Sequence, residues 1–92
     1  MVFSLEQEIY CALYKTKQLN VIQITNIIKH NNETLYETLG NIPGAIISTT
    51  CIKLYKLKKL KRDDTMMPHL YYINHNNAPF SANLSALLLP IE

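Results

Sequence analysis

The sequence predicts a single α+β domain that is mostly helical, with a small β-hairpin and a C-terminal amphipathic helix. Three observations lead to this prediction. Apolar residues recur at helical spacing through the first half of the chain. A short run of strand-forming residues follows the turn formers Asp63-Asp64-Thr65. With 92 residues and 48% hydrophobic content, the chain can build one core and is too apolar to be disordered.

The first two predicted helices each open on a capping box, in which a glutamine follows the capping side chain at the third position. Ser4 and Gln7 form the first pair, and the apolar spacing predicts a helix over residues 5–17. Asn20 and Gln23 form the second pair. Isoleucines at helical spacing then predict a second helix, which ends in a polar His-Asn-Asn sequence.

Asn32 is the third predicted cap. Leu35, Tyr36 and Leu39 follow it at helical spacing, and Gly40 is placed to end this short helix in the left-handed conformation. The next four residues, Asn-Ile-Pro-Gly, predict a turn.

Residues 45–59 permit two predictions. Their isoleucines and threonines favour a strand by propensity. A serine or threonine at the start would instead cap a helix, and the strand alternation fails where Leu54 and Tyr55 are adjacent. We therefore expect a helix from Thr49 to Lys59, with a strand as the alternative.

A β-hairpin is predicted next. Residues 60–62 would begin its first strand, and residues 63–65 supply the turn. Pro68 has no amide donor and therefore belongs at a strand end or edge. Residues 69–73 would form the returning strand, in which two adjacent tyrosines alternate. One tyrosine should face the core, and the other should face the solvent or a partner.

The chain ends with a polar linker at residues 74–79 and an apolar stripe at helical spacing. Ser81 would cap this last helix and Pro90 would stop it. The stripe either folds back on the first helix or pairs with its copy in a homodimer. Its members are Phe80, Leu84, Leu87 and Leu88.

Together these elements predict a winged helix-turn-helix, with a basic recognition helix followed by a two-stranded wing. Residues 1–75 would form the winged-helix domain. Residues 76–92 would form the linker and the helix that packs on the domain or on a dimer partner. A helical bundle with an added hairpin is the competing architecture.

The basic residues are concentrated in one stretch. Residues 1–52 carry a net charge of −1, residues 53–64 a net charge of +4, and residues 65–92 a net charge of −1. Lysines are flexible point charges suited to phosphate, so this patch predicts salt-sensitive contact with a nucleic-acid backbone. A solvated face that serves solubility is the alternative. The candidate contacts are Lys53, Lys56, Lys58, Lys59, Lys61 and Arg62.

The sequence carries no GxSxG, HExxH or glycine-rich phosphate motif, so we expect no enzyme activity and no cofactor. Cys11 and Cys51 lie in apolar patterns without CxxC spacing, which predicts buried free thiols. The three histidines are remote from one another in sequence, so no metal site is expected. No apolar run approaches the roughly 20 residues that span a bilayer. We therefore expect a soluble, intracellular protein without membrane contact.

Two short segments flank the predicted wing turn: Leu54-Tyr55-Lys56-Leu57 before it and Pro68-His69-Leu70-Tyr71 after it. They resemble the Leu-Tyr-x-Leu step and the Pro-Pro-x-Trp wing of the Z-form nucleic-acid-binding domains. These are small winged helices found in a vertebrate RNA-editing deaminase and in several large DNA viruses.

The resemblance implies that Tyr55 packs against a syn base and that Pro68 touches the backbone. It also implies that Tyr71 supports the recognition-helix tyrosine in place of the family's tryptophan. The sequence departs from the family pattern in three places. The family's asparagine and lysine on the recognition helix are replaced by Cys51 and Ile47, and its second wing proline is a histidine here.

We therefore predict a small regulator of transcription that binds duplex nucleic acid through its backbone, with DNA favoured over RNA. Its size, its richness in Ile, Asn and Lys, and the resemblance predict a viral protein in the host cytoplasm or nucleus. Z-form binding is one alternative function. The other is a protein-interaction winged helix whose tail and tyrosine-rich wing bind another protein.

Overall fold

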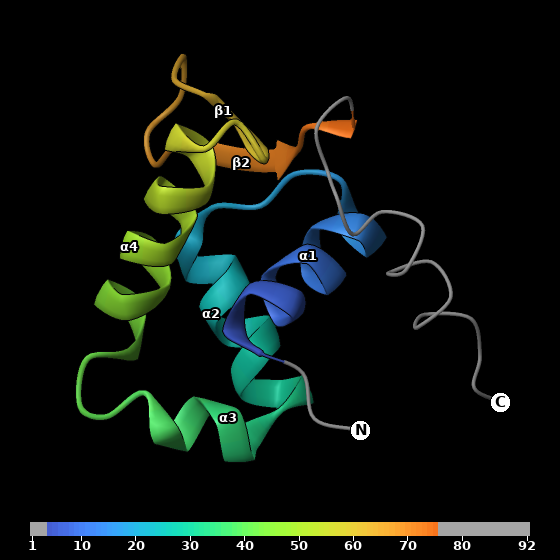
Figure 1. Cartoon of the computed structure of the whole chain (residues 1–92). Helices are drawn as coiled ribbons and strands as arrows, with labels where there is room; N and C mark the ends of the chain where they lie inside the picture. The colour runs from blue at the N-terminus through green and yellow to red at the C-terminus, as the bar shows by residue number, and fades with distance from the viewer. Residues whose placement is uncertain (1–3, 76–92) are drawn as a thin grey trace, which may run out of the picture.

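The computed structural model describes residues 4–75, which form an α+β fold of four helices and one two-stranded antiparallel sheet (Figure 1). The hairpin lies at one end of the helices and the short helix α3 lies at the other. The predicted C-terminal helix lies outside the described residues. The same holds for the stripe considered for a homodimer, Phe80, Leu84, Leu87 and Leu88.

Helices α1 (Leu5–Thr16) and α2 (Val21–Asn31) begin where the capping boxes predict. Ser4 Oγ accepts a hydrogen bond from the Gln7 backbone N–H at 3.2 Å. In return, Gln7 Oε1 accepts one from the Ser4 backbone N–H at 2.8 Å. The same reciprocal pair opens α2 at 2.8 and 3.0 Å. Both predicted helix starts are confirmed, because a capping box depends only on residues three apart.

Helix α3 (Glu33–Thr38) follows α2 almost directly. Asn32 Oδ1 accepts from the Leu35 backbone N–H at 3.1 Å, as predicted for a cap. The same side chain donates through Nδ2 to Glu8 Oε2 at 2.9 Å, which fixes the corner between α2 and α3 against α1. Gly40 has a φ of +81°, so the predicted left-handed end is confirmed.

Helix α4 (Pro43–Lys56) corrects the sequence prediction at both ends. It begins before Thr49, so part of the predicted Asn-Ile-Pro-Gly turn is helical, and it ends before Lys59. Proline at the first helical position suits a helix start, because its φ is fixed and its missing N–H would be unpaired there anyway. The hydroxyls of Thr49 and Thr50 donate to carbonyls four residues back at 2.9 Å each. The strand alternative for residues 45–59 is wrong.

The hydrophobic core lies between α1, α2, α4 and the inner face of the hairpin. Both cysteines are buried free thiols, as predicted. Burial raises the pKa of the Cys51 thiol to about 12, so it stays protonated near neutral pH. Side chains at most 1% exposed make up the centre of the core: Ile9, Tyr10, Leu13, Ile24, Ile28, Ile47, Cys51, Leu54 and Leu60.

The predicted hairpin is confirmed. Strands β1 (Leu60–Asp63) and β2 (Leu70–Ile73) pair antiparallel, with Arg62 opposite Tyr71. Pro68 precedes β2, after a cis peptide bond with Met67.

A backbone bridge ties the hairpin to the helices. The Leu19 N–H donates to the Tyr71 carbonyl at 3.1 Å, and the Tyr71 N–H donates to the Leu19 carbonyl at 2.8 Å. Leu19 lies in the connection between α1 and α2, so β2 has β1 on one side and this connection on the other. The predicted alternation of the tyrosines is confirmed, because Tyr71 is buried and Tyr72 is half-buried.

Within residues 4–75, no helix has the length and apolar character needed to cross a membrane.

The early start of α4 can be tested with two adjacent isoleucines, since Ile47 is fully buried and Ile46 is 37% exposed. Ile47→Ala should lower the free energy of unfolding by about 2–5 kcal/mol through lost burial and a residual cavity. Ile46→Ala, the matched control, should lower it by about 1 kcal/mol or less. Urea unfolding measures both values, and equal losses would contradict the helix register.

Candidate functional site

The end of α4 fixes how the basic residues are presented. After Lys56, the Lys58 N–H bonds the Tyr55 carbonyl and the Lys59 N–H bonds the Leu54 carbonyl, both at 2.9 Å. This is the hydrogen-bond pattern of a Schellman motif, whose left-handed position is usually glycine. Here that position is Lys58, with a φ of +64°. A lysine therefore holds the turn that sends the chain from α4 into β1.

Arg62 on β1 joins three side chains. Its guanidinium carbon lies 4.3 Å from the centre of the Tyr55 ring, in a cation–π contact between β1 and α4. Hydrogen bonds with Tyr71 and then Asp64 raise the pKa of the guanidinium above its usual value. Because the arginine is held on several sides, Tyr55 is fixed in a half-buried position on α4. Arg62 therefore links the buried Tyr71 on β2 to Tyr55 on α4.

Two carboxylates build the turn of the hairpin, as the sequence predicts. Asp63 Oδ1 accepts hydrogen bonds from the Thr65 backbone N–H, at 2.9 Å, and from its hydroxyl. These hydrogen bonds lower the pKa of the Asp63 carboxyl. Asp64 accepts from Arg62 Nε and lies 3.5 Å from His69 Nδ1. Both aspartates therefore hold the hairpin in shape.

An open cavity of about 340 Å³, which we call the basic cavity, lies where α4 passes into β1. Helix α4 contributes one tyrosine to the lining, and the Schellman turn contributes one lysine. Strand β1 contributes a leucine, a lysine and the arginine. Strand β2 and the residue after it complete the lining. The lining residues are Tyr55, Lys58, Leu60, Lys61, Arg62, Tyr72 and Asn74.

A second cavity of about 390 Å³, which we call the wing groove, lies between the start of α2, α4 and the hairpin. Arg62 lines it as well, so the two cavities share this residue. Pro68 is exposed at its edge, next to Met67, which is 82% exposed. Tyr71 contributes to its floor.

The structure therefore divides the predicted site residues. Tyr55, Lys58, Lys61 and Arg62 share the basic cavity, and Pro68 and Tyr71 share the wing groove with Arg62. Three lysines line neither cavity: Lys53, Lys56 and Lys59.

The three remaining lysines differ in exposure. Lys53 Nζ pairs with Glu6 Oε2 on α1 at 3.3 Å, but its side chain is 62% exposed. Lys56 is exposed at the end of α4, whereas Lys59 is half-buried in the turn after it.

The lining residues that sequence reasoning missed include Tyr72, Asn74, Ile22 and Ile52. Tyr72 could have been chosen, because strand alternation places it opposite the buried tyrosine. Asn74 follows the last strand and donates to the Lys58 carbonyl at 2.8 Å, a contact without a local sequence signal. Ile22 and Ile52 line the wing groove from two different helices, so only the tertiary fold brings them together.

No group of three or more His, Cys, Asp or Glu side chains is placed to hold a metal ion among residues 4–75. Comparisons with protein-family models, curated proteins and solved structures found no match for this chain. The side chains of the two cavities are therefore the basis for any functional proposal.

The left-handed lysine can be tested through stability. Lys58→Gly should raise the free energy of unfolding by roughly 0.5–1 kcal/mol, because glycine adopts a positive φ without the Cβ clash. Lys61→Gly, which removes the same charge from the middle of β1, should lower it by a similar amount. Urea titration at fixed ionic strength compares the two. A loss of stability in Lys58→Gly would contradict the turn geometry.

Proposed function

We propose that this chain is a winged-helix protein that binds double-stranded nucleic acid, DNA in preference to RNA, mainly through the phosphate backbone. The observation that carries the proposal is the basic cavity, where Lys58 and Lys61 stand beside a fixed aromatic ring at the junction of α4 and β1. Lysine ammonium groups are flexible point charges that suit contact with the phosphates of a duplex.

The order of the elements supports the winged-helix part of the proposal. In it, α2 and α4 are the two helices of the helix-turn-helix, and the β1–β2 hairpin that follows α4 is the wing. The two helices pack against each other, and the Leu19–Tyr71 bridge anchors the wing to the connection before α2. The helix-turn-helix connection is longer than the usual three or four residues because α3 lies within it.

Each residue of the site has a distinct role in this proposal. Lys58 and Lys61 contact phosphate, and exposed Lys56 extends the contact along the end of α4. Arg62 positions Tyr55, because Asp64 and Tyr71 already engage its guanidinium. The ion pair between Lys53 and its glutamate on α1 is exposed, and such pairs are weak enough to exchange with a phosphate.

The outer face of α4 favours contact with the backbone over direct reading of bases. Its exposed residues are Ala45, Ile46, Thr49, Lys53 and Lys56. Arginine, asparagine and glutamine, the side chains that make bidentate contacts to base edges, do not occur on α4. The proposed binding is therefore shape- and charge-dependent. Its role would be that of a small transcription regulator, which we propose to be viral.

The proposal predicts tight duplex binding at low salt that weakens steeply as salt is added, because bound phosphates release counterions. In the double variant Lys58→Ala/Lys61→Ala, the slope of log K against log salt should fall in magnitude by about 1.8, or about 0.9 for each lost contact. Fluorescence anisotropy of a labelled DNA duplex across a salt series measures the slope.

The matched control is Lys15→Ala/Lys29→Ala, which removes the same charge from α1 and α2, away from both cavities. Its slope should stay near that of the wild type. Equal slopes for all three proteins, or no binding by the wild type at low salt, would contradict the proposal. The second result would favour a protein-interaction winged helix, in which the lysines serve solubility.

Binding to left-handed duplex is a second candidate function, and the placement of Tyr55 favours it. Its ring is half-buried at the end of α4, held by Arg62, and open to the basic cavity beside the wing. A fixed aromatic ring there would be presented to a base edge in the way the resemblance implies.

Circular dichroism of a CG-repeat DNA duplex tests the second candidate. Excess wild-type protein should invert the spectrum, and Tyr55→Ala should abolish the inversion while retaining salt-dependent binding. An unchanged spectrum would remove left-handed binding and leave the backbone proposal intact.

A further inference from the structure

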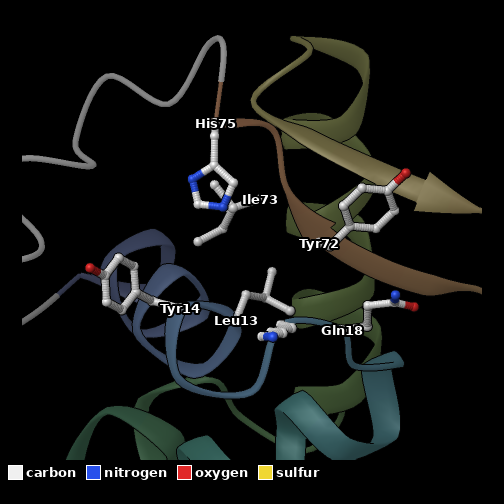
Figure 2. A pocket seen from close by; sticks show the side chains of 7 residues that line it. Leu13, Tyr14, Gln18, Tyr72, Ile73 and His75 are labelled. Atoms are coloured by element: carbon white, nitrogen blue, oxygen red, sulfur yellow. The ribbon is translucent and has the colours of Figure 1, made fainter.

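A groove of about 500 Å³ lies on the side of the molecule where the C-terminal half of α1 meets β2. Figure 2 shows Ile73 on β2 above Leu13 on α1, with Tyr14 to the left, Tyr72 and Gln18 to the right, and His75 at the upper end. We call it the α1–β2 groove. Its floor is the core, since Leu13 is 1% exposed and Ile73 is 5% exposed. Lys17 and Gln18 complete its polar rim.

We propose that the α1–β2 groove is the docking site for this chain's own C-terminal segment, residues 80–88, in the same molecule. The segment's sequence predicts an amphipathic helix. Its apolar stripe, Phe80, Leu84, Leu87 and Leu88, is what an apolar groove with a polar rim would bind. The proposal does not depend on nucleic-acid binding.

The position of the chain supports this occupant. His75, the last described residue, itself lines the groove. The chain therefore continues toward residues 80–88 from the proposed docking site. From His75 to Phe80 an extended chain spans at most about 18 Å. A helix that Ser81 caps would place residues 82–88 in about two turns, roughly 10 Å long.

The same short connection favours docking within one molecule over pairing with a second copy. A short flexible linker gives its tethered segment an effective concentration in the millimolar range. At micromolar protein concentration a second copy would therefore be outcompeted by the chain's own segment.

The charges of the C-terminal segment are compatible with those at the rim of the α1–β2 groove. The only charged side chain in residues 76–92 is Glu92, which is acidic, and the groove rim contributes Lys17 and His75. Burying the stripe in the groove therefore brings no cation against the rim lysine. The segment can bury its apolar face without leaving an unpaired charge inside.

The test uses the full chain and compares amide resonances of three proteins in ¹H–¹⁵N spectra. Leu84→Asp/Leu88→Asp should shift the amides of Tyr14, Gln18, Tyr72 and His75 while leaving those of α2 and α3 in place. Ser85→Asp, which adds a charge outside the stripe, should leave the groove amides unchanged. Unshifted groove amides in the double variant would overturn the proposal.

Limited chymotrypsin digestion gives a second readout from the groove side. Tyr14→Ser removes an exposed part of the groove wall, so cleavage within residues 80–89 should become at least about tenfold faster as the docked fraction falls. Equal cleavage rates in the wild type and Tyr14→Ser would contradict docking. Sedimentation should find a monomer at micromolar concentration, and a dimer that is lost in Leu84→Asp/Leu88→Asp would overturn docking within one molecule.

Discussion

The two backbone hydrogen bonds between Leu19 and Tyr71 determine how the hairpin sits on the helices. A two-stranded hairpin alone is marginally stable in water, so it needs a further strand or a packed face. The bridge supplies a second backbone partner for β2 in addition to β1, and the buried Tyr71 side chain inserts into the core beside it. Arg62 lies opposite Tyr71 in the sheet. The Leu19–Tyr71 bridge therefore also determines where along α4 the Arg62 side chain makes contact.

The pairing of Arg62 with Tyr71 leads to the central feature of the site. There, Arg62 connects the hairpin to Tyr55 on α4. A single cation–π contact is a weak interaction, so this contact does little for overall stability. Its effect is to orient one aromatic ring and to use one positive charge for that purpose. Next to this contact, Lys58 holds a left-handed position that glycine would occupy with less strain.

Sequence signals between neighbouring residues predicted part of this fold. The rest depends on tertiary packing and strand pairing. The capping boxes at Ser4 and Asn20 depend on neighbouring residues, so both helix starts were predictable. The start of α4 was not, because Ile42 makes no side-chain cap there and burial of the α4 face overrides the strand propensity of its β-branched residues. The stretch of basic residues was visible in the sequence. Which of these residues line the basic cavity was not, because the turn at Lys58 carries no glycine and the Arg62–Tyr55 contact depends on strand pairing.

In the proposed function, the junction of α4 and β1 contacts the duplex backbone through the basic cavity. Titration of ¹⁵N-labelled protein with an unlabelled DNA duplex at low salt tests this most directly. Binding through the basic cavity predicts that DNA shifts the amide resonances of Tyr55, Lys58, Lys61 and Tyr72. Added salt should return these resonances to their positions in the free protein. Shifts confined to α1 and α3, with the cavity amides unmoved, would contradict it.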